Sequence, residues 1–110
     1  MTWHPVAKLA DLRPGDVIGV EVAGILMVLV RDGDAVFALQ RHCLHRGGDL
    51  ADGILSRGHL ICPVHGWRFQ AATGRHAEAS EVCLVRYATR IVGDQIEVDP
   101  TPQGPAQVNP

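Results

Sequence analysis

The sequence lacks a strong excess of charge of either sign, because 10 Lys and Arg side chains stand against 12 Asp and Glu side chains, for a net charge of −2. Domains that bind nucleic acid usually carry a marked basic excess, so this class of partner is not favoured. The chain also lacks an apolar run of about 20 residues, which a membrane-spanning helix needs. The longest run, from Val17 to Val30, is interrupted by Glu21. We therefore expect neither nucleic acid nor a membrane as a partner.

The first residues lack a basic segment followed by an apolar segment, which is the pattern of a secretory signal. The three cysteines are an odd number, and their spacing shows no disulfide framework. Disulfides persist mainly in oxidising compartments, whereas clusters of Cys and His in a reducing compartment more often hold metal. These absences predict a cytoplasmic location.

The residues that are present predict one small all-β domain. The chain has 110 residues, 46% of them hydrophobic, which is enough for a single compact core. No segment shows a long helical period, and short apolar stretches alternate with turn signals of Gly, Asp and Pro. We expect an N-terminal meander, a glycine-rich insertion and a closing hairpin. The expected strands are residues 3–9, 17–22, 25–31, 35–39, 58–62, 66–70, 83–92 and 95–98.

The expected domain spans residues 1–99, with a glycine-rich subdomain at about residues 41–75. Residues 100–110 contain four of the seven prolines. Terminal segments of this composition are usually poorly ordered. We therefore expect an extended, flexible tail.

Two short motifs concentrate the metal-binding chemistry of the chain. The first reads Cys43-Leu44-His45 and the second Cys62-Pro63-Val64-His65, with sixteen residues between His45 and Cys62. Thiolate and imidazole donors suit zinc or an iron–sulfur cluster better than Mg²⁺ or Ca²⁺. A structural zinc site usually pairs Cys with Cys and His with His, so the mixed halves fit zinc poorly. They fit a Rieske [2Fe–2S] centre, where two His replace two Cys on one iron.

Residues 43–50 and 62–69, together with Ala72-Thr73-Gly74, resemble the two cluster loops of Rieske proteins, and the likeness covers roughly residues 3–99. The resemblance implies a Rieske-type antiparallel β-sandwich with a small cluster-binding subdomain inserted between strands. It also implies one [2Fe–2S] cluster per chain and no catalytic residue. The implied ligands, which are also the metal-binding residues, are Cys43, His45, Cys62 and His65.

The resemblance also indicates the subtype. High-potential members of respiratory chains carry a cysteine in each loop, joined as a disulfide, near the positions that Gly48 and Val64 occupy here. Those members also carry Ser and Tyr hydroxyls that bond to the cluster sulfurs, at the positions of Trp67 and Phe69. Hydrogen bonds to cluster sulfur raise the reduction potential. Their absence predicts a potential at the low end of the Rieske range, about −150 mV. Leu44 stands where many members have Pro.

A chain of this length leaves no room for the long catalytic domain that related oxygenases add, so we expect an electron carrier rather than an enzyme. The resemblance implies a soluble, low-potential ferredoxin of a bacterial ring-hydroxylating oxygenase system. Such a protein takes one electron from a flavin-dependent reductase and delivers it to a terminal oxygenase. Two alternatives stay open, namely a small Rieske subunit of an assimilatory nitrite reductase and a structural zinc-binding interaction module.

Several residues near the motifs have a structural interpretation. Trp67 and Phe69 are expected to pack under the cluster, and Cys83, outside both loops, is expected to be a small buried apolar side chain. Arginines bracket the loops, and we expect either a solvated surface or a basic rim that docks an acidic partner. These arginines are Arg41, Arg46, Arg57, Arg68 and Arg75.

Overall fold

The computed structural model describes residues 2–44, 47–64, 66–79 and 81–103, and these residues form nine strands and two 3₁₀ turns. No helix in the described residues has the length and hydropathy needed to span a bilayer. The all-β class predicted from the sequence is confirmed. The elements are β1 (His4–Lys8), η1 (Leu9–Asp11), β2 (Val17–Val22), β3 (Ile25–Asp32), β4 (Ala35–Gln40), η2 (Leu50–Asp52), β5 (Ile54–Ser56), β6 (His59–Ile61), β7 (Arg68–Gln70), β8 (Arg86–Val92) and β9 (Gln95–Gln103).

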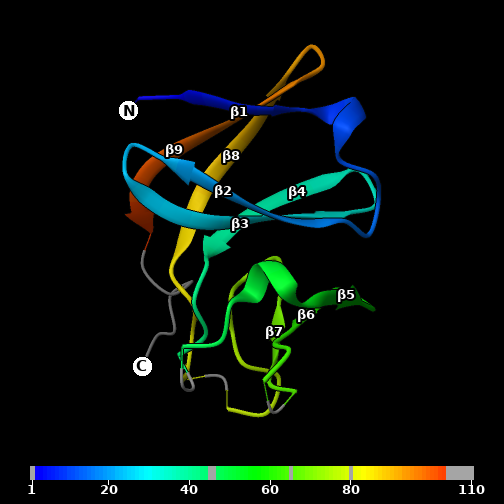
Figure 1. The fold of residues 1–110 in the computed structure, drawn as a ribbon, viewed down its shortest axis with the longest axis vertical. Helices are drawn as coiled ribbons and strands as arrows, with labels where there is room; N and C mark the ends of the chain where they lie inside the picture. The colour runs from blue at the N-terminus through cyan, green and yellow to red at the C-terminus, as the bar shows by residue number, and fades with distance from the viewer. Residues whose placement is uncertain (1, 45–46, 65, 80, 104–110) are drawn as a thin grey trace.

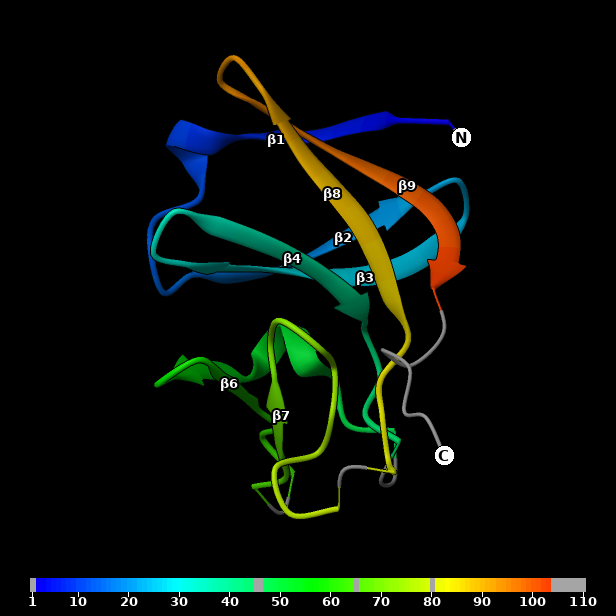
Figure 2. The same cartoon turned by 180° about the vertical axis from the view of Figure 1, so that it is seen from behind.

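The strands form two antiparallel sheets. Six strands make a large sheet in the order β1-β9-β8-β4-β3-β2, and three make a small sheet in the order β5-β6-β7. Figures 1 and 2 show β8 and β9 crossing the direction of β2, β3 and β4, while the small sheet lies at one end of the large one. The predicted meander is therefore β2-β3-β4 and the predicted closing hairpin is β8-β9. The first strand pairs with β9, so the first and last strands are neighbours in the large sheet.

Strand β3 explains why the sequence around it is continuously apolar. Successive side chains of a strand point to opposite faces, and a strand buried on both faces has no polar alternation. Met27 and Leu29 join a core enclosed by the large sheet, together with Ile96 and Val98 of β9. The intervening Val28 joins a second core on the outer face.

The second core joins the large sheet to an inserted subdomain, which we define as residues 41–85 between β4 and β8. The buried side chains of the second core are Val28, Val30, Leu39, Cys43, Leu50, Leu60, Cys62, Phe69, Ala71 and Leu84. The insertion extends beyond the predicted boundary near residue 75. The Ala77 N–H donates to Arg68 O at 2.8 Å, and the Leu84 N–H donates to Gly74 O at 2.8 Å, so the last part of the insertion folds back onto the small sheet.

The predicted tail begins later than residue 100, because β9 continues to Gln103 and pairs with β8 there. Proline lacks an N–H donor and is tolerated where one side of a strand is unpaired. The partner β1 reaches only the His4–Val98 pair, so among the described residues β9 has one neighbouring strand beyond that point, where Pro100 and Pro102 lie. Residues 104–110 lie outside the described part of the chain.

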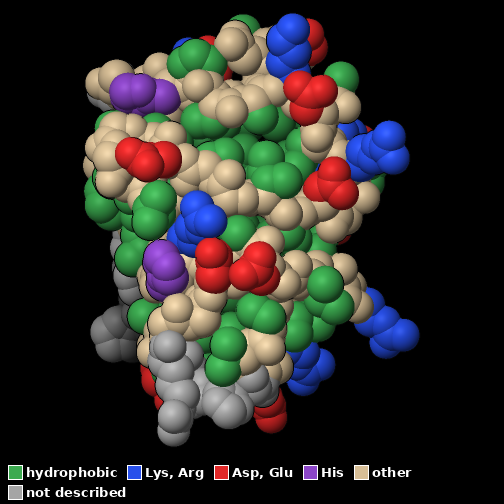
Figure 3. Space-filling view, in the orientation of Figure 1, with side chains coloured by type: hydrophobic (Ala, Val, Ile, Leu, Met, Phe, Trp, Pro, Cys, Tyr) green, Lys and Arg blue, Asp and Glu red, His purple; other side chains and the backbone are tan. Residues whose placement is uncertain are grey.

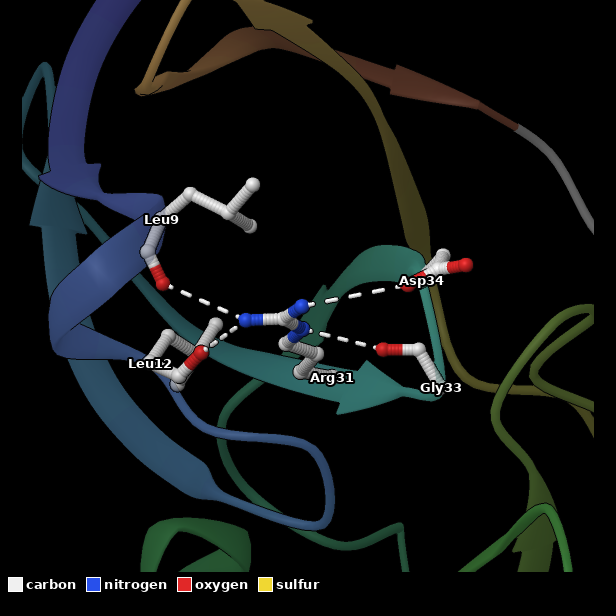
Figure 4. A network of polar contacts seen from close by, with 5 residues as sticks. All are labelled: Leu9, Leu12, Arg31, Gly33 and Asp34. Carbon is white, nitrogen blue, oxygen red and sulfur yellow. Dashed lines mark hydrogen bonds and ion pairs between the residues drawn. The ribbon is translucent and has the colours of Figure 1, made fainter.

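Arg31 at the end of β3 connects the large sheet to the η1 turn (Figure 4). Its guanidinium donates to Leu12 O at 2.6 Å and to Leu9 O at 3.3 Å, and its Nε donates to Gly33 O at 2.9 Å. Asp34 forms an ion pair with the same guanidinium, with 4.0 Å between Arg31 Nη2 and Asp34 Oδ1. These bonds give Leu12 O and Gly33 O a donor, and they give Leu9 O a second donor beside the Leu12 N–H, which closes η1.

Candidate metal centre

The two predicted motifs form loops that close in the same way. The Cys43 N–H donates to Gly48 O at 2.8 Å, and the Cys62 N–H donates to Trp67 O at 2.8 Å. The spacing from donor to acceptor is the same in both cases. We call residues 43–48 the first loop and residues 62–67 the second loop. Each loop therefore begins with a cysteine whose backbone is fixed by the last residue of that loop.

Each loop also has a glycine in the left-handed backbone region at the equivalent position. Gly47 has φ 66° and Gly66 has φ 71°. A residue with a Cβ is strained in this conformation, which explains why glycine occupies both positions. In the first loop the Gly47 N–H also donates to Cys43 O at 3.1 Å. The two loops thus share one backbone design.

The two loops face each other closely. A Cβ placed on Gly48 of the first loop would lie 3.0 Å from Cys62 Sγ and 3.0 Å from Val64 Cγ2 of the second loop. Positions 48 and 64 are therefore in contact. They are the positions at which the resemblance implies a disulfide in high-potential members, and here they hold a glycine and a valine.

The two cysteines are buried in the second core, with exposed fractions of 4% for Cys43 and 1% for Cys62. The Val64 N–H lies 3.4 Å from Cys62 Sγ and donates toward it. A buried thiolate needs such donors or a metal to offset its charge. Soft donors in an apolar shell, with a glycine leaving room between the loops, fit a [2Fe–2S] group.

The other two predicted ligands, His45 and His65, lie outside the described residues. Within the described residues there is no group of three or more potential metal ligands. The structure therefore brings together the two cysteine-bearing loops, and the full ligand set stays a prediction.

An aromatic group supports the second loop. The ring of His76 meets Trp67 at 4.6 Å and Phe69 at 5.4 Å between centroids, both edge to face. Such arrangements are favourable for aromatic pairs. The His76 Nδ1 accepts from the backbone N–H groups of Glu78 at 3.0 Å and Ala79 at 3.2 Å, so this ring is the Nε2–H tautomer. Phe69 is fully buried, as predicted, whereas the role of His76 was not predicted.

An ion pair lies at the base of the first loop. The Arg41 Nε donates to Asp49 Oδ1 at 3.1 Å, and its Nη2 donates to Asp49 Oδ2 at 3.3 Å. The Ala51 N–H also donates to Asp49 Oδ1, at 2.9 Å. The hydrogen bond from Arg41, followed by the one from Ala51, holds the pKa of the Asp49 carboxyl below its usual range. The same pairing raises the pKa of Arg41.

The arginines around the loops were expected to form either a solvated surface or a basic rim. Arg41 is bound to Asp49, and Arg75 is half-buried. Arg46 lies outside the described residues, while Arg57 and Arg68 are exposed. Figure 3 shows basic and acidic side chains mixed on the face it presents. A solvated, mixed surface therefore describes that face better than a basic rim.

The third cysteine belongs to neither loop. Cys83 is half-buried, and its thiol donates to Thr73 O at 3.4 Å. It was predicted to be a small buried side chain, and the partial exposure shows that it is less buried than expected.

The fold and the two facing loops define the class, which is a small β protein whose two cysteine-bearing loops fit an iron–sulfur cluster. Residues 2–88 match the Rieske [2Fe–2S] domain, and the chain belongs to this family. The domain holds a single [2Fe–2S] cluster.

The chain is similar over most of its length to ferredoxins of dioxygenase systems. The ferredoxin component of the naphthalene 1,2-dioxygenase system of Pseudomonas aeruginosa is 30% identical over 98 residues, which are 88% of this chain and 94% of that protein. The ferredoxin of carbazole 1,9a-dioxygenase from Nocardioides aromaticivorans superposes with a TM-score of 0.85 at 32% identity, covering 92% of this chain and 100% of that one.

A solved complex of reduced oxygenase and oxidised ferredoxin in carbazole 1,9a-dioxygenase contains a chain with a TM-score of 0.84 and 26% identity, covering 92% of this chain and 95% of that one. A nitrite reductase small subunit from Mycobacterium tuberculosis has a TM-score of 0.80 at 24% identity, covering 88% of this chain and 93% of that one. The likeness to the nitrite reductase small subunit shows a common fold alone.

Proposed function

We propose that this chain is the ferredoxin of a ring-hydroxylating oxygenase system and that Cys43, His45, Cys62 and His65 hold its single [2Fe–2S] cluster. The observation that supports this most directly is the contact between the loops, where Gly48 leaves room beside Cys62 Sγ. When bound, the cluster accepts and releases one electron. The chain is then an electron carrier and not an enzyme.

The chain's own residues supply the binding and the surroundings of that cluster. The thiolates of Cys43 and Cys62 would hold one iron and the imidazoles of His45 and His65 would hold the other, as in Rieske centres. The buried apolar shell around Cys43 and Cys62 limits access of water. Trp67 and Phe69 offer no hydroxyl to the cluster sulfurs, which favours a low potential, about −150 mV.

The proposed partners are a flavin-dependent reductase as the electron donor and a terminal oxygenase as the acceptor, in the cytoplasm. The ferredoxin–oxygenase complex among the similar structures supports the acceptor. A nitrite reductase small subunit is the second candidate, supported by its shared fold. The zinc-binding module is set aside, because the chain belongs to a [2Fe–2S] family.

The decisive experiment compares two cysteine variants. We expect the purified protein to be red-brown and to give the reduced-state electron paramagnetic resonance spectrum of a Rieske centre. Cys62→Ser is expected to abolish both signals. Cys83→Ser, the matched control outside the loops, is expected to keep them. An intact two-iron spectrum in Cys62→Ser would overturn the ligand assignment, and a colourless wild-type protein that contains zinc would overturn the function.

The carrier and the nitrite reductase subunit are separated by their partners. A carrier accepts electrons from an NADH-dependent flavin reductase and supports turnover of a purified ring-hydroxylating oxygenase. A nitrite reductase subunit instead copurifies with a large reductase subunit from its native host and leaves the oxygenase inactive.

A further inference from the structure

The ion pair between Arg41 and Asp49 lies where the first loop leaves the large sheet. Arg41 is the first residue after β4, and Asp49 is the residue before η2. The Leu50 N–H donates to Arg41 O at 2.8 Å, one step outside the bond between Cys43 and Gly48. A backbone bridge between His42 and Asp49 lies between these two bonds. The ion pair therefore closes the base of the hairpin whose tip is the first loop.

The guanidinium of Arg41 also lies directly against β2. A Cβ placed on Gly19 would be 2.7 Å from Arg41 Cζ, 2.9 Å from Nη1 and 3.0 Å from Nη2. Ile18 and Val20 pack into the core of the large sheet, so position 19 points to the opposite face. That face is the one toward the inserted subdomain. Any side chain at position 19 would displace the guanidinium.

These contacts join three parts of the molecule through one side chain. We infer that Arg41 is a positioning residue for the first cluster loop, which acts by pairing with Asp49 while its guanidinium rests against Gly19 of β2. The inference rests on the proposed function, because it concerns the loop that bears Cys43. A bidentate guanidinium is suited to this role, since its planar fork fixes the carboxylate in two directions.

The two loops differ in their side-chain anchors. The second loop continues into β7, and its Trp67 packs on the rings of Phe69 and His76. The first loop is followed by the short η2 turn, and Asp49 receives both the Arg41 bonds and the Ala51 N–H. The ion-pair side chains are 28% and 33% exposed, so salt should weaken the anchor. In Figure 3 acidic, basic and His side chains meet near the level at which η2 contacts the large sheet.

The test measures how fast the holoprotein loses its cluster, by the bleaching of its visible absorption. Arg41→Gln is expected to lose the cluster roughly tenfold faster than the wild type, the lower end of the range for residues that support metal ligands. The matched control is Arg90→Gln, which removes another ion pair, Arg90 Nε to Glu97 Oε1 at 2.6 Å, from the β8–β9 hairpin. We expect this control to match the wild type. Equal rates for Arg41→Gln and Arg90→Gln would overturn the inference.

Further variants test the route through Asp49 and Gly19. Asp49→Asn should lose the cluster about as fast as Arg41→Gln, and the double variant should be no faster than either. Arg41→Lys keeps the positive charge and should lose the cluster more slowly than Arg41→Gln. Gly19→Ala should accelerate loss in the wild type but not in Arg41→Gln, where no guanidinium is displaced. A Gly19→Ala effect of equal size in both backgrounds would contradict the proposed contact.

A local readout separates positioning from general stability. Amide exchange at Gly47 and Leu50, whose N–H groups bond within the hairpin, should rise in Arg41→Gln while exchange in β3 stays unchanged. A uniform rise through both regions would contradict the role. If the wild type shows no Rieske signal, the proposed function fails. If the wild type shows the signal and Arg41→Gln behaves as Arg90→Gln, the inference alone fails. Should Arg41→Gln not fold, the comparison of Asp49→Asn with Arg90→Gln decides the question, and equal rates of cluster loss in these two variants would overturn the inference.

Discussion

The large sheet and the inserted subdomain are stabilised in different ways. In the large sheet, β3 has eight residues and β9 has nine, and their alternating side chains fill a core of their own. In the inserted subdomain each strand has three residues. Its buried side chains pack on the outer face of the large sheet, against Val28, Val30 and Leu39.

This difference shows which part depends on the cofactor. Hydrophobic burial alone can stabilise the large sheet, because its core closes between its own strands. The inserted subdomain depends on three contributions, which are the outer face of the sheet, backbone hydrogen bonds in the two loops, and the proposed cluster. Metal binding is part of folding in sites of this kind. Changes made in either part should therefore have different effects on cluster retention and on the stability of the large sheet.

Removal of the cluster by chelation should have the largest effect, and it should be local. The backbone N–H groups of Cys43 and Cys62 are expected to lose exchange protection by orders of magnitude, because the bonds that close the loops then open readily. The N–H groups of β3 should keep their protection. Hydrogen exchange measured on the holoprotein and the apoprotein checks this. Equal loss of protection in both regions would contradict the division.

Cavities in the two cores should separate stability from cluster retention. Phe69→Ala in the second core and Met27→Ala in the core enclosed by the large sheet should each lower the free energy of unfolding by about 2–5 kcal/mol. Phe69 lies beside the second loop, so its variant should also lose the cluster faster. Met27→Ala should retain the cluster at conditions where it is folded. Denaturant unfolding measures the free energy of unfolding, and absorption bleaching measures the rate of cluster loss. Equally fast bleaching in both variants would contradict a special role of Phe69 in cluster retention.

The same division explains what could be predicted from the sequence. The strands of the large sheet follow from their β-branched runs and from turns such as Asp32-Gly33-Asp34. The strand β5 (Ile54–Ser56) was not predicted, and it is defined by its pairing with β6. The end of β9 was missed because Pro100 and Pro102 argue against a strand, and the open side of β9 that tolerates them is set by tertiary pairing.

The candidate site, like the fold, could be predicted from the sequence only in part. The two cysteine-bearing loops could be predicted, because each Cys/His motif is a short run of neighbouring residues. The contact of Arg41 with Gly19 joins segments that are far apart in the sequence, and that of His76 with Trp67 forms where the chain after β7 folds back, so no local pattern reports either. They become visible only once the sheet topology is known.

A smaller effect is expected where the loops touch. Gly48→Ala places a methyl group 3.0 Å from Cys62 Sγ and from Val64, and overpacking of this kind costs about 1–3 kcal/mol. Cluster incorporation, measured as iron per chain, should fall. The double variant Gly48→Ala/Val64→Ala should recover part of it, since the second change removes methyl groups from one side of the contact. Full incorporation in Gly48→Ala alone would show that the loops are further apart than described.

The smallest effect concerns a buried carboxylate of β9. The Thr101 N–H donates to Asp99 Oδ1 at 2.9 Å, and this bond lowers the pKa of Asp99. A group with a lowered pKa in the folded state contributes stability above its unfolded pKa, about 3.9, and loses it as the pH falls through the folded value. The wild type should therefore lose more stability than Asp99→Asn on acidification. Denaturant unfolding at a series of pH values tests this, and parallel curves would contradict it.

The central claim is that the two facing loops share one cluster with two histidine ligands. Pulsed electron paramagnetic resonance of the reduced protein tests it most directly, because nitrogen nuclei bound to iron couple to the unpaired electron. We predict two strong nitrogen couplings in the wild type, one of which disappears in His45→Ala or His65→Ala if the variant retains the two-iron centre. A reduced cluster in the wild type with no strong nitrogen coupling would contradict the account.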